Sequence, residues 1–77
     1  MHDRTALVVD DERDIRELLV VTLTRMGLKV ETAATVSAAK QQLAEQAFDF
    51  CLTDMRLPDG NGMEILALIN EIYPSTP

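Results

Sequence analysis

Hydrophobic residues in this chain occur in short continuous runs and in longer stretches with helical spacing. Residues 5–9 (Thr-Ala-Leu-Val-Val) and residues 50–53 (Phe-Cys-Leu-Thr) are short apolar runs that end at Asp10 and at Asp54. Such runs are typical of strands that are buried on both faces, as in the middle of a parallel sheet. Residues 29–33 (Lys-Val-Glu-Thr-Ala) alternate in character and predict a strand at the edge of the sheet. The pattern therefore predicts three strands.

Three further stretches show the spacing of three and four residues that is typical of amphipathic helices. Their recurring, largely apolar positions are Ile15, Leu18, Leu19, Thr22, Leu23 and Met26 in the first stretch, Val36, Ala39, Leu43 and Ala47 in the second, and Ile65, Leu66, Ile69, Ile72 and Tyr73 in the third. Gly27 is placed to end the first helix in a left-handed conformation, Thr35 to cap the second helix, and Pro74 to stop the third. Proline and glycine in residues 55–61 predict a loop, and residues 74–77 predict a turn or tail.

The alternation of strand and helix predicts a parallel sheet in which each helix crosses over between two strands. With the first strand at the centre, right-handed crossovers give the strand order 2-1-3 and place the first two helices on opposite faces. The order reverses between strands 1 and 3, which opens a crevice at their carboxyl ends. Asp10 and Asp11 follow the first strand, and Asp54 follows the third. We therefore expect an α/β fold in which three carboxylates converge at this crevice.

Three carboxylates that approach one another must protonate, move apart or bind a cation, because their like charges repel. A hard divalent cation satisfies them, and Mg²⁺ prefers a few carboxylates together with water and phosphate. Asp10 and Asp11 alone would more simply be interpreted as charges at the start of the first helix, where the helix dipole favours anions. Asp54, at the end of a second buried strand, favours a metal and phosphate site instead.

Composition narrows the class of protein. The chain has 77 residues, a formal net charge of −6 and 47% hydrophobic residues, so it allows one small domain and is too apolar to be disordered. The one cysteine, Cys51, excludes an intrachain disulfide and fits a reducing cytosol. No apolar run approaches the roughly 18 residues of a membrane span. We expect a soluble, cytoplasmic protein whose acidic balance disfavours direct nucleic-acid binding by this segment.

Two segments carry a resemblance to a known family. Residues 8–12 (Val-Val-Asp-Asp-Glu) and residues 52–62 (Leu-Thr-Asp-Met-Arg-Leu-Pro-Asp-Gly-Asn-Gly) resemble the two acidic signatures of response-regulator receiver domains. The resemblance covers residues 5–77, and the Arg-Leu-Pro-Asp-Gly run is most similar to the NtrC-like branch and, within it, to regulators of type IV pilus genes. It implies a flavodoxin-like fold, of which residues 1–77 would be the N-terminal part, with strands 1–3, helices 1–3 and no second domain.

The resemblance also implies roles for individual residues. Asp54 matches the phospho-acceptor, Asp11 a direct Mg²⁺ ligand, and Asp10 a metal-site acid that acts through water. The main-chain carbonyl of Arg56 matches the remaining protein ligand. In this family the phosphoryl donor is a phosphohistidine on a sensor histidine kinase, and a downstream output domain controls transcription. Gly62 need only be a turn residue, although it would also allow a close backbone approach to the third helix.

Charged residues of the first helix admit two interpretations. They are Arg13, Arg16 and Glu17. Such residues usually form a solvated face, and in this family the first helix is also the place where kinases dock. The sequence alone favours neither interpretation.

The chain departs from the family in its length, and this leaves rival functions open. Receiver domains have five strands, whereas this chain stops after the third helix. It lacks the hydroxyl residue that follows strand 4 and the lysine that follows strand 5. An aspartate-nucleophile phosphatase would need an acid two residues after Asp54, where this chain has Arg56, so we expect no enzyme. The alternative is a non-catalytic interaction module that keeps the fold without a working switch.

The absence of strands 4 and 5 from these residues also predicts self-association. If the chain ends at Pro77, residues 50–53 become an unprotected strand edge, and such an edge invites another strand. The third helix would lose cover at Ile65, Leu66, Ile69 and Ile72. We then expect a homodimer through strand 3 or helix 3. A longer receiver would instead cover the edge in cis.

Overall fold

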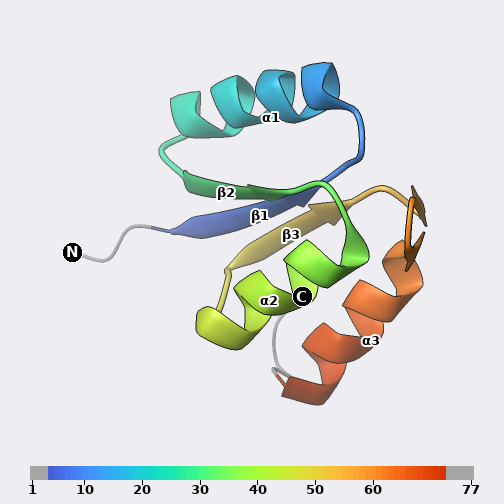
Figure 1. The fold of residues 1–77 in the computed structure, drawn as a ribbon. Coiled ribbons are helices and arrows are strands. Elements are labelled where there is room, and N and C mark those ends of the chain that lie inside the picture. The colour runs from blue at the N-terminus through green and yellow to red at the C-terminus, as the bar shows by residue number, and fades with distance from the viewer. Residues whose placement is uncertain (1–3, 73–77) are drawn as a thin grey trace.

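The computed structural model describes residues 4–72 and has the predicted alternation of strands and helices (Figure 1). The elements are β1 (Thr5–Val9), α1 (Arg13–Arg25), β2 (Lys29–Ala33), α2 (Val36–Glu45), β3 (Phe50–Thr53), β4 (Arg56–Leu57), β5 (Gly60–Asn61) and α3 (Gly62–Ile72). The predicted loop at residues 55–61 contains a feature that the sequence did not indicate. Its two ends pair as the antiparallel β4–β5 hairpin, with Arg56 opposite Asn61.

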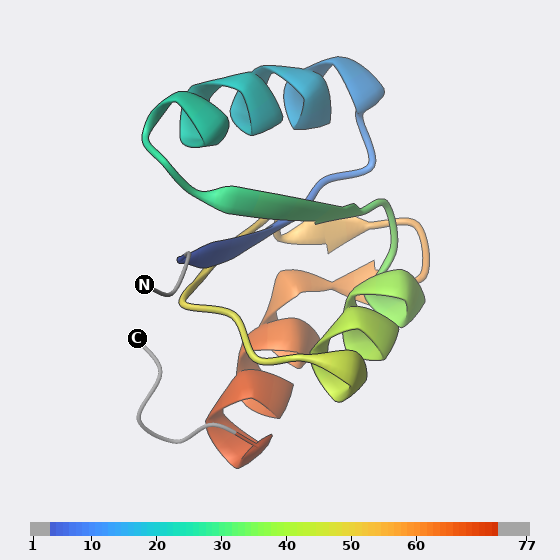
Figure 2. The same ribbon diagram turned by 90° about the vertical axis from the view of Figure 1, so that its left-hand side faces the viewer.

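The main sheet is parallel and has the order β2-β1-β3, which confirms the predicted fold class. Hydrogen bonding continues past the strand ends, because the Asp10 amide donates to the Ala33 carbonyl at 3.1 Å and the Asp54 amide donates to the Val9 carbonyl at 2.8 Å. Helix α1 lies on one face of the sheet, and α2 and α3 lie together on the other (Figures 1 and 2). This arrangement is the one that right-handed crossovers require.

Two of the predicted helix ends are confirmed. Gly27 follows α1 with a φ of 89°, a left-handed conformation that glycine adopts without a steric penalty. The Thr35 hydroxyl accepts a hydrogen bond from the Ala38 amide at 3.0 Å and so caps α2. Pro74, the predicted stop of the third helix, lies outside the described residues. The helices of residues 4–72 are too short or too polar to serve as membrane spans.

The hydrophobic core lies between the sheet and the pair α2 and α3. Its buried members are Leu7, Val9, Ala33, Val36, Ala39, Leu43, Phe48, Leu57, Ile65 and Ile69. The predicted inward positions Val36, Ala39 and Leu43 are confirmed. The prediction for Ala47 is wrong: it is exposed because α2 ends at Glu45 and the chain then becomes extended.

The opposite face of the sheet is covered less completely. Ala6 and Val8 are buried beneath α1, yet no residue of α1 is itself fully buried. Phe50 and Leu52 pair with Ala6 and Val8 and share their face, but they are 42% and 44% exposed. The prediction that strand 3 is buried on both faces is therefore wrong on the α1 side, because α1 does not extend over this strand.

Helix α3 is better covered than the sequence indicated. Ile65 and Ile69 are 0% and 7% exposed, since they belong to the core shared with α2. The expectation that they would lose their cover is wrong, and only Leu66, at 38%, is exposed as expected. The side chain of Ile72, and all of Tyr73, lie outside the described residues.

Candidate functional site

Three carboxylates meet at the carboxyl ends of the two neighbouring strands β1 and β3. Asp10, Asp11 and Asp54 each offer an oxygen, and these oxygens all lie within 4.8 Å of one another. Asp10 and Asp54 are half-buried and Asp11 is exposed, so the cluster opens to solvent on one side. The structure thus brings together the three acidic residues that the strand order predicted to converge.

The loop between β1 and α1 holds Asp10 in a fixed orientation. The Glu12 amide donates to Asp10 Oδ1 at 2.9 Å, and Arg16 Nη1 donates to the Asp10 carbonyl at 2.7 Å. Helix α1 begins after Glu12 without a side-chain cap, so Asp10 orders the loop ahead of the helix rather than capping the helix itself. Sequence reasoning missed the role of Arg16, because neither a solvated face nor a docking surface implies a bond to this loop.

Arg13 and Glu17, the other two residues considered for kinase docking, behave as a solvated face. Arg13 Nε and Glu17 Oε1 lie 3.1 Å apart, one helical turn from each other, and both side chains are largely exposed. Pairs of this kind contribute little to stability. They leave the kinase-docking interpretation untested.

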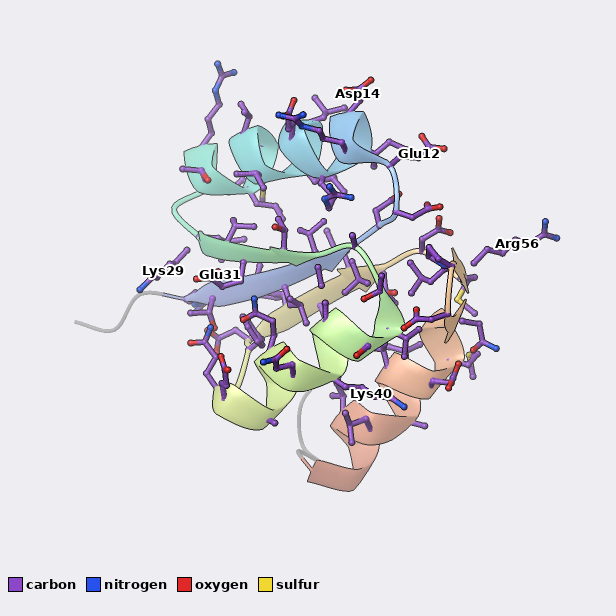
Figure 3. The ribbon with its side chains drawn as sticks, viewed as in Figure 1. Glu12, Asp14, Lys29, Glu31, Lys40 and Arg56 are labelled. Atoms are coloured by element: carbon purple, nitrogen blue, oxygen red, sulfur yellow. The ribbon has the colours of Figure 1, made fainter. Side chains whose placement is uncertain are left out.

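Asp54 is oriented by the residues that follow it. The Arg56 amide donates to Asp54 Oδ1 at 3.3 Å, which directs this carboxylate toward the start of the β4–β5 hairpin. The Arg56 side chain extends outward into solvent (Figure 3), so the main chain of this residue, and not its guanidinium, lies next to Asp54.

Gly62 allows α3 to begin directly against the end of β3. A Cβ atom at position 62 would lie 2.5 Å from the Asp54 carbonyl oxygen and 3.1 Å from Thr53 Cγ2. Real Cβ atoms do not approach backbone that closely, so a side chain here would force α3 away from the site. The Gly62 amide donates to the Met55 carbonyl at 3.1 Å. The expectation that Gly62 permits a close approach to the third helix is confirmed.

Asp59, in the turn of the hairpin, is a residue that sequence reasoning missed. Its carboxylate accepts hydrogen bonds from the amides of Val36 at 2.7 Å and Ser37 at 3.0 Å. The bonds from Ser37 and Val36 hold the pKa of Asp59 below its usual range. The available signal was indirect: a helix leaves its first amides without intrahelical partners, and Thr35 alone satisfies only one of those of α2.

The start of α3 carries a reciprocal cap. Asn61 Oδ1 accepts from the amides of Met63 at 2.9 Å and Glu64 at 3.3 Å, and the Asn61 amide donates to Glu64 Oε2 at 3.0 Å. This spacing is that of a capping box, so it was readable from the sequence. Glu64 Oε1 also lies 3.9 Å from Lys40 Nζ of α2.

The donor set fits a hard divalent cation. Mg²⁺ binds oxygen ligands at about 2.0–2.1 Å, so two ligands on opposite sides of the ion lie about 4 Å apart. The three carboxylate oxygens, which all lie within 4.8 Å of one another, are close to this spacing. The exposed side of Asp11 leaves room for water and for a phosphate oxygen.

The sequence of the chain matches a family model, that of the response regulator receiver domain, over residues 6–77. The match includes all three carboxylates and nearly every described residue. The chain belongs to the response-regulator receiver domain family.

Curated relatives within this family include DNA-binding regulators. The chain is 52% identical over 77 residues to the response regulator protein PilR of Pseudomonas aeruginosa. The aligned region covers all of this chain and 17% of PilR. The chain is 36% identical over 74 residues to the DNA-binding transcriptional regulator NtrC of Azospirillum brasilense, which is 96% of this chain and 15% of NtrC. The resemblance to the NtrC-like branch is thereby confirmed, whereas the assignment to pilus genes stays a prediction.

Solved receiver structures share the fold. The response regulator TrrA of Thermotoga maritima, in complex with Mg²⁺ and beryllofluoride, is 31% identical with a TM-score of 0.86, over 92% of this chain and 62% of that one. TrrA has also been solved in complex with the histidine kinase ThkA, with 30% identity and a TM-score of 0.86 over 95% of this chain and 63% of that one. The chain therefore spans less than two thirds of either of these two receiver structures.

Proposed function

We propose that this receiver chain accepts a phosphoryl group on Asp54, with Mg²⁺ held by Asp10, Asp11, Asp54 and the main-chain carbonyl of Arg56. The observation that supports the proposal is the convergence of three carboxylates, within 4.8 Å, at the point where the strand order reverses. Open parallel sheets keep their sites at this point. The Mg²⁺–beryllofluoride complex of TrrA supports it from a structural neighbour.

Asp54 and Arg56 would have separate roles in the transfer of the phosphoryl group. The Arg56 amide holds Oδ1 of Asp54, which leaves Oδ2 as the attacking oxygen. As the bond between Oδ2 and phosphorus forms, the bond between phosphorus and the imidazole nitrogen of the donor breaks, and the donor leaves as neutral histidine after taking up a proton. Bound Mg²⁺ would supply charge neutralisation between the anionic donor and the carboxylate. Asp54 would thus act as a phospho-acceptor and not as part of a hydrolase.

The partners follow from this role. A sensor histidine kinase would supply the phosphoryl group, as the complex of TrrA with ThkA suggests. In a longer protein a downstream domain would contact DNA, in line with the DNA-binding regulator NtrC, and the acidic receiver segment would not. Such a system operates in the cytoplasm.

One experiment tests the proposal directly. The chain is incubated with Mg²⁺ and acetyl phosphate, and its intact mass is compared with that of Asp54→Asn and of Asp49→Asn, an aspartate at the opposite end of the sheet. The wild type and Asp49→Asn should gain the mass of one phosphoryl group, and Asp54→Asn should not. We expect the modification to be weak or short-lived, because the hydroxyl and lysine that hold the phosphoryl oxygens in this family are not among these 77 residues.

A second candidate function is supported by the α1 face. Phe50 and Leu52 are exposed on β3, whose outer edge has no partner strand within residues 4–72, and they line an apolar groove with Leu23, Met26 and Leu28. We infer that a polypeptide of these 77 residues dimerises through β3. The burial of Ile65 and Ile69 favours β3 over α3 as the dimer surface.

Sedimentation equilibrium tests this second function. The 77-residue polypeptide should form a two-fold dimer at micromolar concentration, and Leu52→Lys should shift it to monomer, because a charge on the strand discourages pairing. Glu45→Lys, at the exposed last residue of α2, is the matched control and should leave the dimer intact. A compact wild-type monomer contradicts the inference.

A further inference from the structure

The β4–β5 hairpin connects the three carboxylates to the N-terminus of α2. At one end, the Arg56 amide donates to Asp54 Oδ1 at 3.3 Å. At the turn, Asp59 accepts from the amides of Val36 at 2.7 Å and Ser37 at 3.0 Å. A single short segment of chain therefore touches both the candidate metal site and the first turn of a helix on the core side of the sheet.

The hairpin cannot hold its own position. Each of its strands has two residues, and an isolated two-stranded hairpin is at best marginally stable in water. Three side chains attach it to the rest of the molecule. Leu57 is buried in the core, Asp59 binds α2, and Asn61 caps α3. The turn of the hairpin depends on Asp59 in particular, since Leu57 and Asn61 lie on the strands before and after it.

A carboxylate suits this contact better than any neutral side chain. Both of its oxygens are used, one for each of the first two amides of α2. The negative charge also lies at the positive end of the helix dipole. Thr35 satisfies the third amide, so the two residues together complete the N-terminus of α2. Loss of Asp59 would return two amides to water and release the turn.

We propose that Asp59 is a positioning residue for the metal site: by fixing the hairpin to α2 it fixes the main-chain carbonyl of Arg56. This inference rests on the proposed function, in which that carbonyl is a metal ligand. Because coupling between two sites is reciprocal, a bound metal should in turn stabilise the contact of Asp59 with Val36 and Ser37.

The chain offers a matched control at the other end of the sheet. Asp49 also uses its carboxylate to accept a backbone bond, from the Thr5 amide at 2.8 Å. Both aspartates are exposed, and each joins two segments that are distant in sequence. Substitution of either aspartate should lower the stability of the fold, but only Asp59 belongs to the hairpin.

The first measurement is amide hydrogen exchange in the metal-free chain, with folding checked by far-UV circular dichroism. In Asp59→Ala, exchange should become faster at Val36, Ser37 and the hairpin amides, and in Asp49→Ala it should not. Equal exchange at these amides in wild type and Asp59→Ala overturns the inference. This result does not depend on metal, so it decides the point even if the chain fails to bind a cation and the proposed function is wrong.

The second measurement is Mn²⁺ binding, followed by loss of the free-ion paramagnetic resonance signal. Asp59→Ala should raise the dissociation constant for Mn²⁺ about tenfold, which is the loss of affinity typical of mutating a residue that orients a metal ligand. Asp59→Asn keeps one acceptor oxygen and should fall between wild type and Asp59→Ala. Mn²⁺ should also slow exchange at Val36 and Ser37. A dissociation constant that is unchanged in Asp59→Ala, or raised equally in Asp49→Ala, contradicts the proposal.

Discussion

The two faces of the sheet differ in how they are built. The face beneath α2 and α3 holds a contiguous core, in which side chains from both helices, the sheet and the hairpin are buried together. The face beneath α1 buries Ala6 and Val8 but leaves Phe50 and Leu52 exposed. The carboxylates lie where the two faces meet, at the ends of β1 and β3. Their supports come from both faces, from Arg16 on α1 and from the hairpin held by α2.

This difference suggests that the two faces of the sheet have different roles. The α2 and α3 face supplies stability and holds the loop that follows Asp54, while the α1 face offers an apolar surface to other polypeptide. Apart from the contact of Arg16 with Asp10, site geometry should therefore respond mainly to changes on the first face, and association should respond to changes on the second.

The largest effect is expected in the core. Leu43 is 1% exposed and Leu18, on α1, is 65% exposed. Leu43→Ala should lower the free energy of unfolding by about 2–5 kcal/mol, because it removes buried methyl groups and leaves a cavity. Leu18→Ala should change it by less than about 0.5 kcal/mol. Urea unfolding measures both, and similar losses for the two variants would remove the distinction between the faces.

The next effect concerns thiol reactivity on the two sides of β3. Cys51 faces the core, and burial raises its pKa from 9.0 to about 11. The folded chain should then hold about 100-fold less thiolate than the unfolded chain at pH 8, and alkylation should slow to match. The matched variant combines Cys51→Ala with Leu52→Cys, which moves the thiol to the exposed side. Equal alkylation rates for the two positions would contradict the assignment of faces.

Gly62 tests the contact between α3 and the site. Gly62→Ala places a Cβ atom 2.5 Å from the Asp54 carbonyl oxygen, so α3 must shift. We expect a loss of about 1–3 kcal/mol, the usual cost of overpacking, together with weaker phosphorylation. Gly27→Ala is the control, since its positive φ causes strain far from the site. Chemical denaturation and intact mass report the two effects, and normal phosphorylation of Gly62→Ala would show that the α3 contact is dispensable.

The smallest stability effect is expected from metal. Mg²⁺ that binds the folded chain should stabilise it by about 1.4 kcal/mol at ten times the dissociation constant. Asp11→Ala should abolish this gain and leave the helical signal intact, because Asp11 is exposed and its loss disturbs little packing. Thermal unfolding with and without about 10 mM Mg²⁺ or Mn²⁺ measures the shift. An unchanged melting temperature in the wild type would contradict a formed metal site.

Local patterns sufficed for much of this fold. The apolar runs before Asp10 and Asp54 predicted the two neighbouring strands, and handedness placed both carboxylates at one edge of the sheet. Gly27 and Thr35 predicted helix ends because their conformations and bonds involve near neighbours. Features of this kind depend on residues close in sequence, and a single sequence contains them.

The rest of the fold and of the site depends on contacts between residues that are distant in sequence. Asp59 binds amides that lie 22 and 23 residues earlier in the chain, and no spacing rule predicts such a pair. The apolar character of Phe50 and Leu52 predicted burial, but their exposure depends on how far α1 reaches across the sheet. Ile65 has the same apolar character and is buried, because α2 happens to cover it.

Asp54 is the proposed acceptor of the phosphoryl group, at a site completed by Asp10 and Asp11. The most direct test locates the modification after incubation with acetyl phosphate, by fragmentation of the intact chain in a mass spectrometer. We expect one phosphoryl group on Asp54, dependent on Mg²⁺, lost in Asp11→Ala and sensitive to hydroxylamine as an acyl phosphate must be. A phosphoryl group on any other residue, or on Asp54 without need of a divalent cation, would rule out this site.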